Sequence, residues 1–341
     1  MAENRKATII DVAKLAGVSV ATVSRVVNGN YPVKPDTKKR VNKAIKELKY
    51  VPNMQARELN MQKSSSIGVV VPGLYNMFFA EVIDGIESTV QAAGYSLLLS
   101  CAQNDPEREK NCISALASRN VAGIIIISPN TSEVEEEFYS DIVARMPCVF
   151  INAYRHFSGA SYVSNDEAGG TKMALEHFWK LGHRRIMFVR GVNSDSYQVK
   201  EEIYAGFMKR NEVFDKKLIV NIGEGNSVST VDTSAEVLTK VIGTIKPTAI
   251  MCCNDLIAVG ALNAANSLGL EVPKDLSIMG FDNISLSRFV SPKITTMDQN
   301  MKSLGSNAAT LLREKIETGL SKRVVLENSL VLRESTGKAK K

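Results

Sequence analysis

The chain has 341 residues, of which 44% are hydrophobic and 23% charged, with 42 Lys and Arg against 36 Asp and Glu. This composition is that of an ordinary globular protein, with room for a small domain and one or two larger ones. No apolar run reaches the roughly 18 residues of a membrane span, and the polar, charged N-terminus is unlike a secretion signal. These features exclude a membrane-spanning protein and indicate a cytoplasmic one.

The positive charge is concentrated at the N-terminus. Up to Lys63 the chain has 13 Lys and Arg against 5 Asp and Glu, whereas the remainder has 29 against 31. Such a basic segment suits a polyanion such as DNA, although a solvated Lys-rich face is the ordinary alternative. The cysteines, five in number, fall mostly in or beside apolar strands and not at metal-ligand spacings, so we expect reduced core residues.

Residues 8–28 have the spacing of a helix-turn-helix. Thr8 and Ser19 stand where N-caps belong, and Asp11 adds a near capping box to the first helix. Gly17 can take the positive φ of the tight turn. A third helix is predicted over about 36–49. We therefore expect an all-α helix-turn-helix DNA-binding domain whose second helix buries Val18, Val23 and Val26.

Strands and helices alternate after a linker at 62–66. The strands are predicted at 67–71, 96–99, 123–128, 149–152, 185–189, 218–222, 249–253 and 276–281. The helices between them are predicted at 78–93, 105–119, 133–146, 168–181, 199–211, 234–242 and 256–268. Near-continuous apolar strands alternating with helices favour two doubly wound parallel-sheet α/β lobes. A strand at 293–299, a helix at 301–318 and a strand at 324–332 follow.

The segments SVATVSRVVN (19–28) and YVPNMQAREL (50–59) resemble the lactose/galactose repressor (LacI/GalR-type) family of transcriptional regulators, and the similarity continues to about Glu334. The resemblance implies a DNA-binding domain at 1–52, a hinge helix and linker at 53–66, and a periplasmic-binding-protein-like core at 67–334. Lobe 1 would comprise about 67–163 and 298–321, and lobe 2 about 164–295 and 322–334. A basic tail follows at 335–341, and its last four residues, 338–341, are expected to be disordered.

The resemblance also implies which residues contact DNA. Arg25 is suited to bidentate guanine readout, whereas Val20 and Ala21 offer only apolar contact to a thymine methyl group. Leu59 and Ala56 match the apolar wedge that the family's hinge helices push into the minor groove. The complete expected set is Thr8, Ser19, Val20, Ala21, Thr22, Ser24, Arg25, Asn28, Tyr50, Asn53, Ala56, Arg57 and Leu59.

An effector site is expected in the cleft between the lobes, at the carboxyl ends of the strands. Asp282 and Asn254 match family positions that hydrogen-bond sugar hydroxyls, and Phe78 and Phe79 match aromatics beside the ligand, although one of that pair is expected in the core. Asp255 is expected to cap the helix that follows it. The complete expected set is Phe78, Phe79, Asn152, Arg155, Arg190, Asn254, Phe281, Asp282 and Gln299.

One position departs from the family. Relatives commonly carry an arginine where this chain has Ile203, and Lys200 and Arg190 are the two candidates to replace it. The missing arginine weakens the case for a neutral sugar and leaves a sugar acid or another small metabolite open.

The leading interpretation is a homodimeric, bacterial, nucleoid-associated regulator that binds a palindromic double-stranded DNA operator. It would repress genes of carbohydrate or sugar-acid metabolism under control of a small-molecule effector. One alternative is a catabolite-type regulator controlled by a phosphorylated phosphocarrier protein as corepressor; a less favoured one is a solute-binding protein. The sequence has no catalytic signature, no metal-ligand spacing and no complete cofactor loop, so we expect neither an enzyme nor a metal or cofactor.

Overall fold

The computed structural model describes residues 7–29, 31–51, 64–192 and 194–340. The chain forms two compact units, Met1–Ser64 and Ser65–Lys341. Among the described residues, no helix is both long and apolar enough to cross a membrane. The expected hinge segment falls almost entirely outside the described residues.

The N-terminal unit contains three helices around one small core. They are α1 (Ile9–Ala16), α2 (Val20–Asn28) and α3 (Pro35–Glu47). Thr8 caps α1 in a capping box with Asp11, and the Ser19 side chain accepts from the Thr22 backbone N–H at the start of α2. Gly17 ends α1 with φ of +60°, which favours glycine because it has no Cβ. Val23 is fully buried, and Val18 and Val26 pack against the same core, as the spacing predicted.

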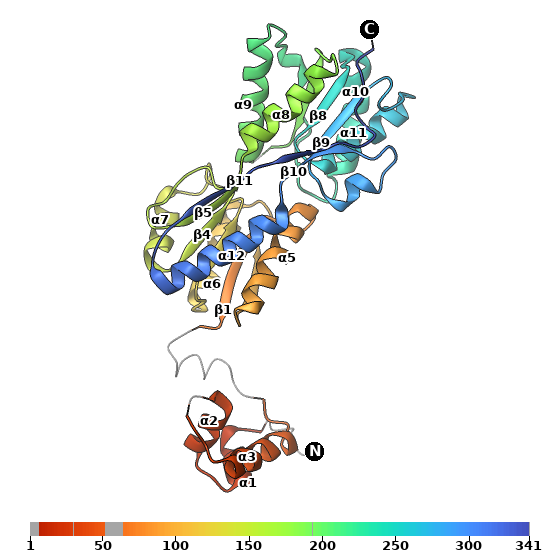
Figure 1. Ribbon diagram of the computed structural model, residues 1–341. Coiled ribbons are helices and arrows are strands. Elements are labelled where there is room, and N and C mark those ends of the chain that lie inside the picture. The colour runs from red at the N-terminus through yellow and green to blue at the C-terminus, as the bar shows by residue number, and fades with distance from the viewer. Residues whose placement is uncertain (1–6, 30, 52–63, 193, 341) are drawn as a thin grey trace. The chain divides into compact units, whose positions relative to one another are not determined.

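Lobe 1 of the larger unit is a parallel sheet in the order β11-β5-β4-β3-β1-β2 (Figure 1). Its strands are β1 (Ser66–Val71), β2 (Ser96–Cys101), β3 (Ile124–Ile127), β4 (Cys148–Ile151), β5 (Ser161–Asn165) and β11 (Arg323–Leu326). The accompanying helices are α5 (Met77–Ala92), α6 (Pro106–Ser118), α7 (Glu136–Arg145) and α12 (Met301–Thr318). α5 and α12 pack so closely that an added Cβ at Gly305 would lie 2.0 Å from the Val82 carbonyl oxygen.

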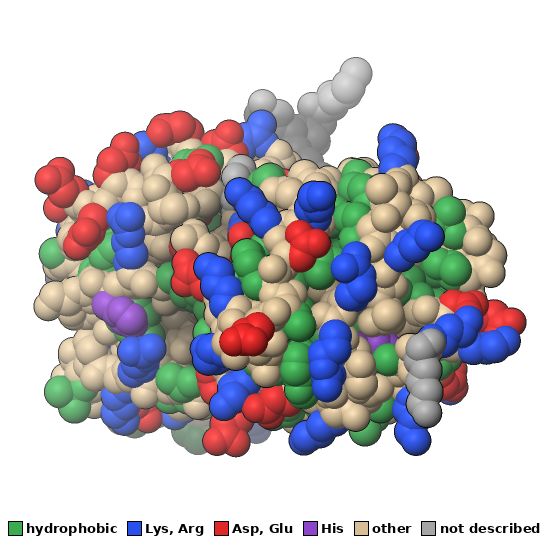
Figure 2. All heavy atoms as spheres, turned by 90° about the horizontal axis from the view of Figure 1, so that it is seen from above, with side chains coloured by type: hydrophobic (Ala, Val, Ile, Leu, Met, Phe, Trp, Pro, Cys, Tyr) green, Lys and Arg blue, Asp and Glu red, His purple; other side chains and the backbone are tan. Residues whose placement is uncertain are grey.

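Lobe 2 is a second sheet, in the order β12-β10-β9-β8-β6-β7. Its strands are β6 (Ile186–Arg190), β7 (Ile219–Asn221), β8 (Ala249–Cys252), β9 (Ser277–Asp282), β10 (Thr295–Asp298) and β12 (Ser329–Val331), of which β12 is antiparallel to β10. The helices are α8 (Glu167–Lys180), α9 (Asp195–Arg210), α10 (Thr230–Ile245) and α11 (Asp255–Ser267), with 3-10 helices η1 (Lys216–Leu218) and η2 (Ser285–Arg288). Figure 2 shows one face of the molecule, on which Lys and Arg are interspersed with Asp and Glu and do not form a surface of one sign.

The end of the chain differs from the prediction in two respects. The single strand predicted at 324–332 is two strands, and the first of them, β11, pairs with β5 in lobe 1, although 322–334 was assigned wholly to lobe 2. Disorder was expected for 338–341, but the described part of this stretch is hydrogen-bonded to lobe 2. The backbone N–H of Ala339 donates to the Leu181 carbonyl at 2.9 Å, and the Gly337 carbonyl lies 2.9 Å from Nε2 of the buried His183. These contacts fix the tail on lobe 2.

The lobes are connected by three stretches of chain that lie side by side. They follow β5, follow β10 and join β11 to β12. The Asn165 side chain donates to the Gln299 carbonyl at 2.6 Å, and the Asn328 side chain donates to the Asp166 carbonyl at 3.1 Å. The connections are therefore hydrogen-bonded to one another as well as to the sheets.

Candidate functional site

The residues that the sequence predicted at base edges lie on the open face of α2. Val20 is 41% exposed, and Ala21 and Arg25 are also exposed, whereas Val23 faces the core. The Arg25 guanidinium lies 5.4 Å from the centre of the Tyr31 ring, a cation–π distance that helps to hold the side chain at the surface. The opposite face of α2 packs against the hydrophobic core. The face that carries Val20, Ala21 and Arg25 is therefore the one that a binding partner can reach.

The side chains of the remaining predicted DNA contacts differ in whether they already form hydrogen bonds within the protein and in how far they are buried. Ser19 and Thr22 bond to each other at the start of α2, and the Asn28 side chain donates to Ser24 Oγ at 3.1 Å. The Thr8 hydroxyl is used in its capping box. Tyr50 is half-buried against the helical core. The predicted contacts that lie outside the described residues are Asn53, Ala56, Arg57 and Leu59.

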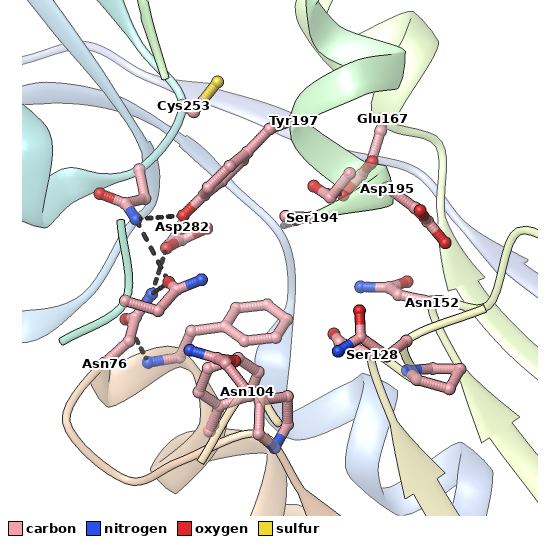
Figure 3. Close-up of a pocket in the computed structure, with 18 of the residues that line it drawn as sticks. Asn76, Asn104, Ser128, Asn152, Glu167, Ser194, Asp195, Tyr197, Cys253 and Asp282 are labelled. Carbon is pink, nitrogen blue, oxygen red and sulfur yellow. Dashed lines mark hydrogen bonds between the residues drawn. The ribbon is translucent and has the colours of Figure 1, made fainter. Parts of the chain in front are cut away.

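A pocket lies between the lobes of the larger unit, where loops and helix starts of both lobes converge (Figure 3). Of the predicted effector residues, it is lined by Phe78, Phe79, Asn152, Asn254, Asp282 and Gln299. The other three predicted residues, Arg155, Arg190 and Phe281, do not line it. Phe281 is fully buried in the core of lobe 2, where its ring packs against the Lys200 ammonium, and Arg190 forms an ion pair with Glu201.

Asp282 ends β9 and is only 4% exposed. Its carboxylate accepts from Gln299 Nε2 and, at 3.4 Å, from Asn76 Nδ2, so it is bonded to lobe 1 from lobe 2. Burial raises the pKa of Asp282 to about 7, against the opposing effect of the nearby Lys200 ammonium. This carboxyl group is therefore close to the point at which its protonated and ionised forms are equally populated at neutral pH.

Lys200 is a buried cation, 1% exposed, on the pocket side of α9. Its Nζ donates to the Cys253 carbonyl at 3.2 Å, lies 3.8 Å from Glu167 Oε1 and sits 4.0 Å from the centre of the Phe281 ring. Of the two candidates to replace an arginine at Ile203, only Lys200 therefore lines the pocket.

Asn254 connects α11 to the pocket. Its side chain accepts from the Ile257 backbone N–H, which makes it the N-cap of α11, and donates at 2.8 Å both to the Tyr197 hydroxyl and to the Gly225 carbonyl. The prediction that Asp255 caps this helix was wrong. Asp255 is the buried first residue of α11, and its carboxylate accepts from Thr296 Oγ1 and the Ile284 backbone N–H.

Several lining residues were not predicted. Asn76 caps α5, Glu167 and Asp195 are the first residues of α8 and α9, and Glu109 lies in the first turn of α6. The prediction followed polar residues after strands and missed those at helix starts. In a doubly wound fold both meet at the same edge of the sheet, so polar residues in the first helical turn were the signal that could have found them.

Comparisons with known proteins agree with this architecture. Residues 8–53 match the family model of bacterial regulatory proteins of the lacI family, and residues 175–336 match a periplasmic binding protein-like domain. The HTH-type transcriptional repressor PurR of Haemophilus influenzae (strain PittEE) is 34% identical over 339 residues, covering 96% of this chain and 98% of the relative. PurR of Pasteurella multocida (strain Pm70) is 34% identical over 333 residues with the same coverage.

Solved structures show the same likeness. The lac repressor dimer bound to operator and the anti-inducer ONPF has a TM-score of 0.85 at 27% identity, covering 98% of this chain and 100% of that chain. A complex of the transcriptional regulator CelR with cellobiose has a TM-score of 0.69 at 26% identity, covering 96% and 99%.

A helix-turn-helix unit together with a two-lobed α/β unit that has a pocket between its lobes is the architecture of a DNA-binding regulator. The chain belongs to the LacI family of bacterial regulatory proteins. It is a DNA-binding transcriptional repressor and not an enzyme. Repressors of this family bind operator DNA, dimerise and bind small-molecule effectors.

Proposed function

We propose that operator binding by this repressor is controlled by a small polyhydroxyl ligand, a sugar in the simplest case, that binds in the pocket between the lobes. The observation that carries the proposal is the polar set around Asp282: a carboxylate and the amides of Asn76, Asn254 and Gln299 converge from both lobes. Carboxylates and amides suit vicinal hydroxyls, since one carboxylate can accept from two of them.

The charge of the pocket argues against a sugar acid. The described lining holds four carboxyl groups, those of Glu109, Glu167, Asp195 and Asp282, and a single cation, Lys200. A ligand carboxylate or phosphate placed among them would meet more repulsion than attraction. We therefore favour a ligand without negative charge.

The aromatic pair Phe78 and Phe79 supports a ring-shaped ligand. Both are 5% exposed and line the pocket, and their ring centres are 5.3 Å apart in an edge-on arrangement. An aromatic face packs well against the apolar face of a sugar ring or against a flat base. The cellobiose complex of CelR favours a sugar as the ligand. The whole-length likeness to PurR repressors makes a purine base or nucleoside the second candidate. That likeness does not support the expectation that the regulated genes belong to carbohydrate metabolism.

Control would pass through the lobes to the DNA-binding units. Asn76 donates to Asn226 at 3.0 Å, and Asn104 donates to Glu224 at 3.3 Å, so hydrogen bonds at the pocket join lobe 1 to lobe 2. A ligand that competes for these groups changes the preferred orientation of the lobes, and thereby the operator affinity of a dimer. By linkage, ligand and operator alter each other's affinity by the same factor.

For the DNA-binding unit we propose direct base readout by Arg25, with Val20 and Ala21 in apolar contact and Ser19, Thr22 and Ser24 beside them. A dimer of such units fits a palindromic operator. Leu59 and Ala56 remain the proposed minor-groove wedge.

The test is operator affinity at fixed salt, measured with palindromic DNA from upstream of the gene, in the presence of sugars, sugar acids, sugar phosphates, purine bases and nucleosides. We expect one uncharged or cationic member to shift the affinity. A shift caused only by sugar acids or phosphates would contradict the charge argument. Tight binding that no small molecule alters, but that a phosphorylated phosphocarrier protein changes, would favour the corepressor alternative.

A further inference from the structure

The acidic groups of the pocket are not balanced by its cation. Lys200 pairs with Glu167 at 3.8 Å and also lies near Asp282. Among the described residues, Glu109 and Asp195 have no ion-pair partner, although Glu109 is only 5% exposed. A buried carboxylate without a cation is costly. Burial accordingly raises the pKa of Glu109, and a positive charge supplied by a ligand would stabilise its ionised form.

Consecutive residues place these two carboxylates at the same end. The backbone N–H of Asn130 donates to Glu109 at 3.1 Å, and the hydroxyl of Thr131 donates to Asp195. Glu109 also accepts from the Tyr139 hydroxyl. Figure 3 shows Asp195 across the pocket from Asp282 and Asn76, on the side where Asn152 and Ser128 also lie. Glu167, which pairs with Lys200, lies on this side as well, so Glu109 and Asp195 are the two carboxyl groups of the pocket that have no cation of their own among the described residues.

The hydrogen-bonding groups show the same imbalance. Most side-chain donors of the lining already bond to protein acceptors; they belong to Asn76, Asn104, Asn152, Tyr154, Lys200 and Asn254. In contrast, Oε1 of Gln299, a lining residue that is 2% exposed, is a buried acceptor without a hydrogen-bond partner in the described structure. Its Nε2 is committed to the Asp282 carboxylate, which fixes the orientation of the amide. Among the described lining residues, the side-chain donors left free are those of Ser128, Asn130, Ser194 and Asn226, whereas acceptors remain on the four carboxyl groups and on Gln299 Oε1.

We propose that the ligand carries a protonated amine as well as hydroxyl groups, as an amino sugar does, and that its ammonium lies between Glu109 and Asp195. An ammonium group supplies three donors, no acceptor and the missing positive charge. The inference rests on the proposed control by a polyhydroxyl ligand and narrows its class. Glu109 and Asp195 are then the residues that select an amine.

The experiment uses the full chain and matched trios of ligands. Each trio is a parent sugar, its 2-amino derivative and its N-acetyl derivative, for instance glucose, glucosamine and N-acetylglucosamine, with the galactose and mannose series beside it. Binding is measured by calorimetry, and operator affinity is measured in parallel at constant ionic strength. In at least one series we expect the amine to bind at least tenfold more tightly than its parent and the N-acetyl derivative to lose that gain.

Isosteric variants locate the ammonium. Asp195→Asn and Glu109→Gln each remove one carboxylate and keep the shape, and we expect each to reduce the ratio of amine affinity to parent affinity several-fold. Glu202→Gln is the matched control, since it removes the same charge from an exposed position on α9. It is expected to leave the preference unchanged.

The outcomes separate this inference from the function on which it rests. A parent sugar that binds and shifts operator affinity, with no gain for its amine, overturns the inference and leaves the proposed function in place. An amine preference that survives in both Asp195→Asn and Glu109→Gln overturns the assigned position. If no sugar of any series binds or alters operator affinity, both proposals fail.

Discussion

Asn76 and Asp282 meet across the pocket, with Asn76 Nδ2 3.4 Å from Asp282 Oδ2, although they are 206 residues apart in the chain. Asn76 caps α5 in lobe 1, and Asp282 ends β9 in lobe 2. A single hydrogen bond thus joins a helix start to a strand end and closes the pocket on that side. Its partners are also the groups best placed to bind a ligand, so pocket occupancy and lobe contact are chemically coupled.

Asn76→Asp tests this contact through pH. Aspartate is as good an N-cap as asparagine, so α5 keeps its start, but the new carboxylate faces Asp282. Loss of the Asn76 donor and the added negative charge both raise the pKa of Asp282 above its wild-type value of about 7. At pH 8 the pair must therefore either hold two repelling charges or bind a proton, whereas at pH 5 Asp282 is protonated and can donate. We expect a loss of roughly 1–3 kcal/mol in unfolding free energy at pH 8 and a smaller loss at pH 5, measured by urea denaturation. Asn76→Ala is the control and should lose a similar amount of unfolding free energy at both pH values. A loss in Asn76→Asp that is also independent of pH would contradict the contact between residue 76 and Asp282.

Asp282→Asn should change the pH dependence of stability. The pKa of Asp282 is raised from 3.8 to about 7 in the folded chain by burial, so between these values the folded state binds more protons than the unfolded state. The unfolding free energy contributed by this group is therefore fully present below pH 3.8 and is lost as pH rises through 7. Relative to the wild type, Asp282→Asn should become more stable as pH rises from 4 to 8, by a few kcal/mol at most. The exposed Asp232→Asn is the control, and parallel curves for wild type and Asp282→Asn would refute the expectation.

Lys200→Met should be strongly destabilising. It leaves the buried Glu167 without its ion-pair partner and Asp282 without a neighbouring cation. Removing one partner of a buried ion pair lowers the unfolding free energy by about 3–5 kcal/mol. Thermal unfolding measures the loss. Lys172→Met is a matched control, because Lys172 and Glu176 form an ion pair of the same 3.8 Å length at the surface. An exposed pair contributes about 0–1 kcal/mol, so equal effects of the two variants would show that burial does not set the cost.

Arg25→Ala should weaken operator binding by about 1–3 kcal/mol and relax the preference for guanine at one position, if its guanidinium makes a bidentate contact. Competition between operator and scrambled DNA at one salt concentration measures both effects. Lys14→Ala, which removes an exposed cation from α1, serves as the control. Equal loss on every DNA sequence would assign Arg25 to a phosphate instead.

The sequence predicted best what local chemistry determines. Thr8, Ser19 and Gly17 act where their capping and turn propensities placed them, and the buried strands of both lobes follow continuous apolar runs. Asp282 and Asn254 were found because each directly follows such a run. These features depend on neighbours within a few residues.

What the sequence did not reveal depends on how distant parts close on one another. β11 belongs to lobe 1 because Val324 and Leu326 pack against that lobe's core, and no local pattern distinguishes this core from the other. The exclusion of Arg190 and the inclusion of Lys200 likewise depend on the rotation of α9 against β8 and β9. Glu109 could be suspected from its place in the first turn of α6, but only the fold distinguishes it from Glu107 in the same turn, which does not line the pocket.

The three hydrogen-bonded connections between the lobes limit how this repressor can move. The three connections can bend together, but they resist sliding of one lobe past the other. Such sliding would break the hydrogen bonds that the side chains of Asn165 and Asn328 donate. We therefore expect the lobes to move relative to each other mainly by bending at these three connections. A mutation that makes the connections more rigid, far from the pocket, would leave the ligand contacts intact. It would still change the coupling free energy between ligand binding and operator binding.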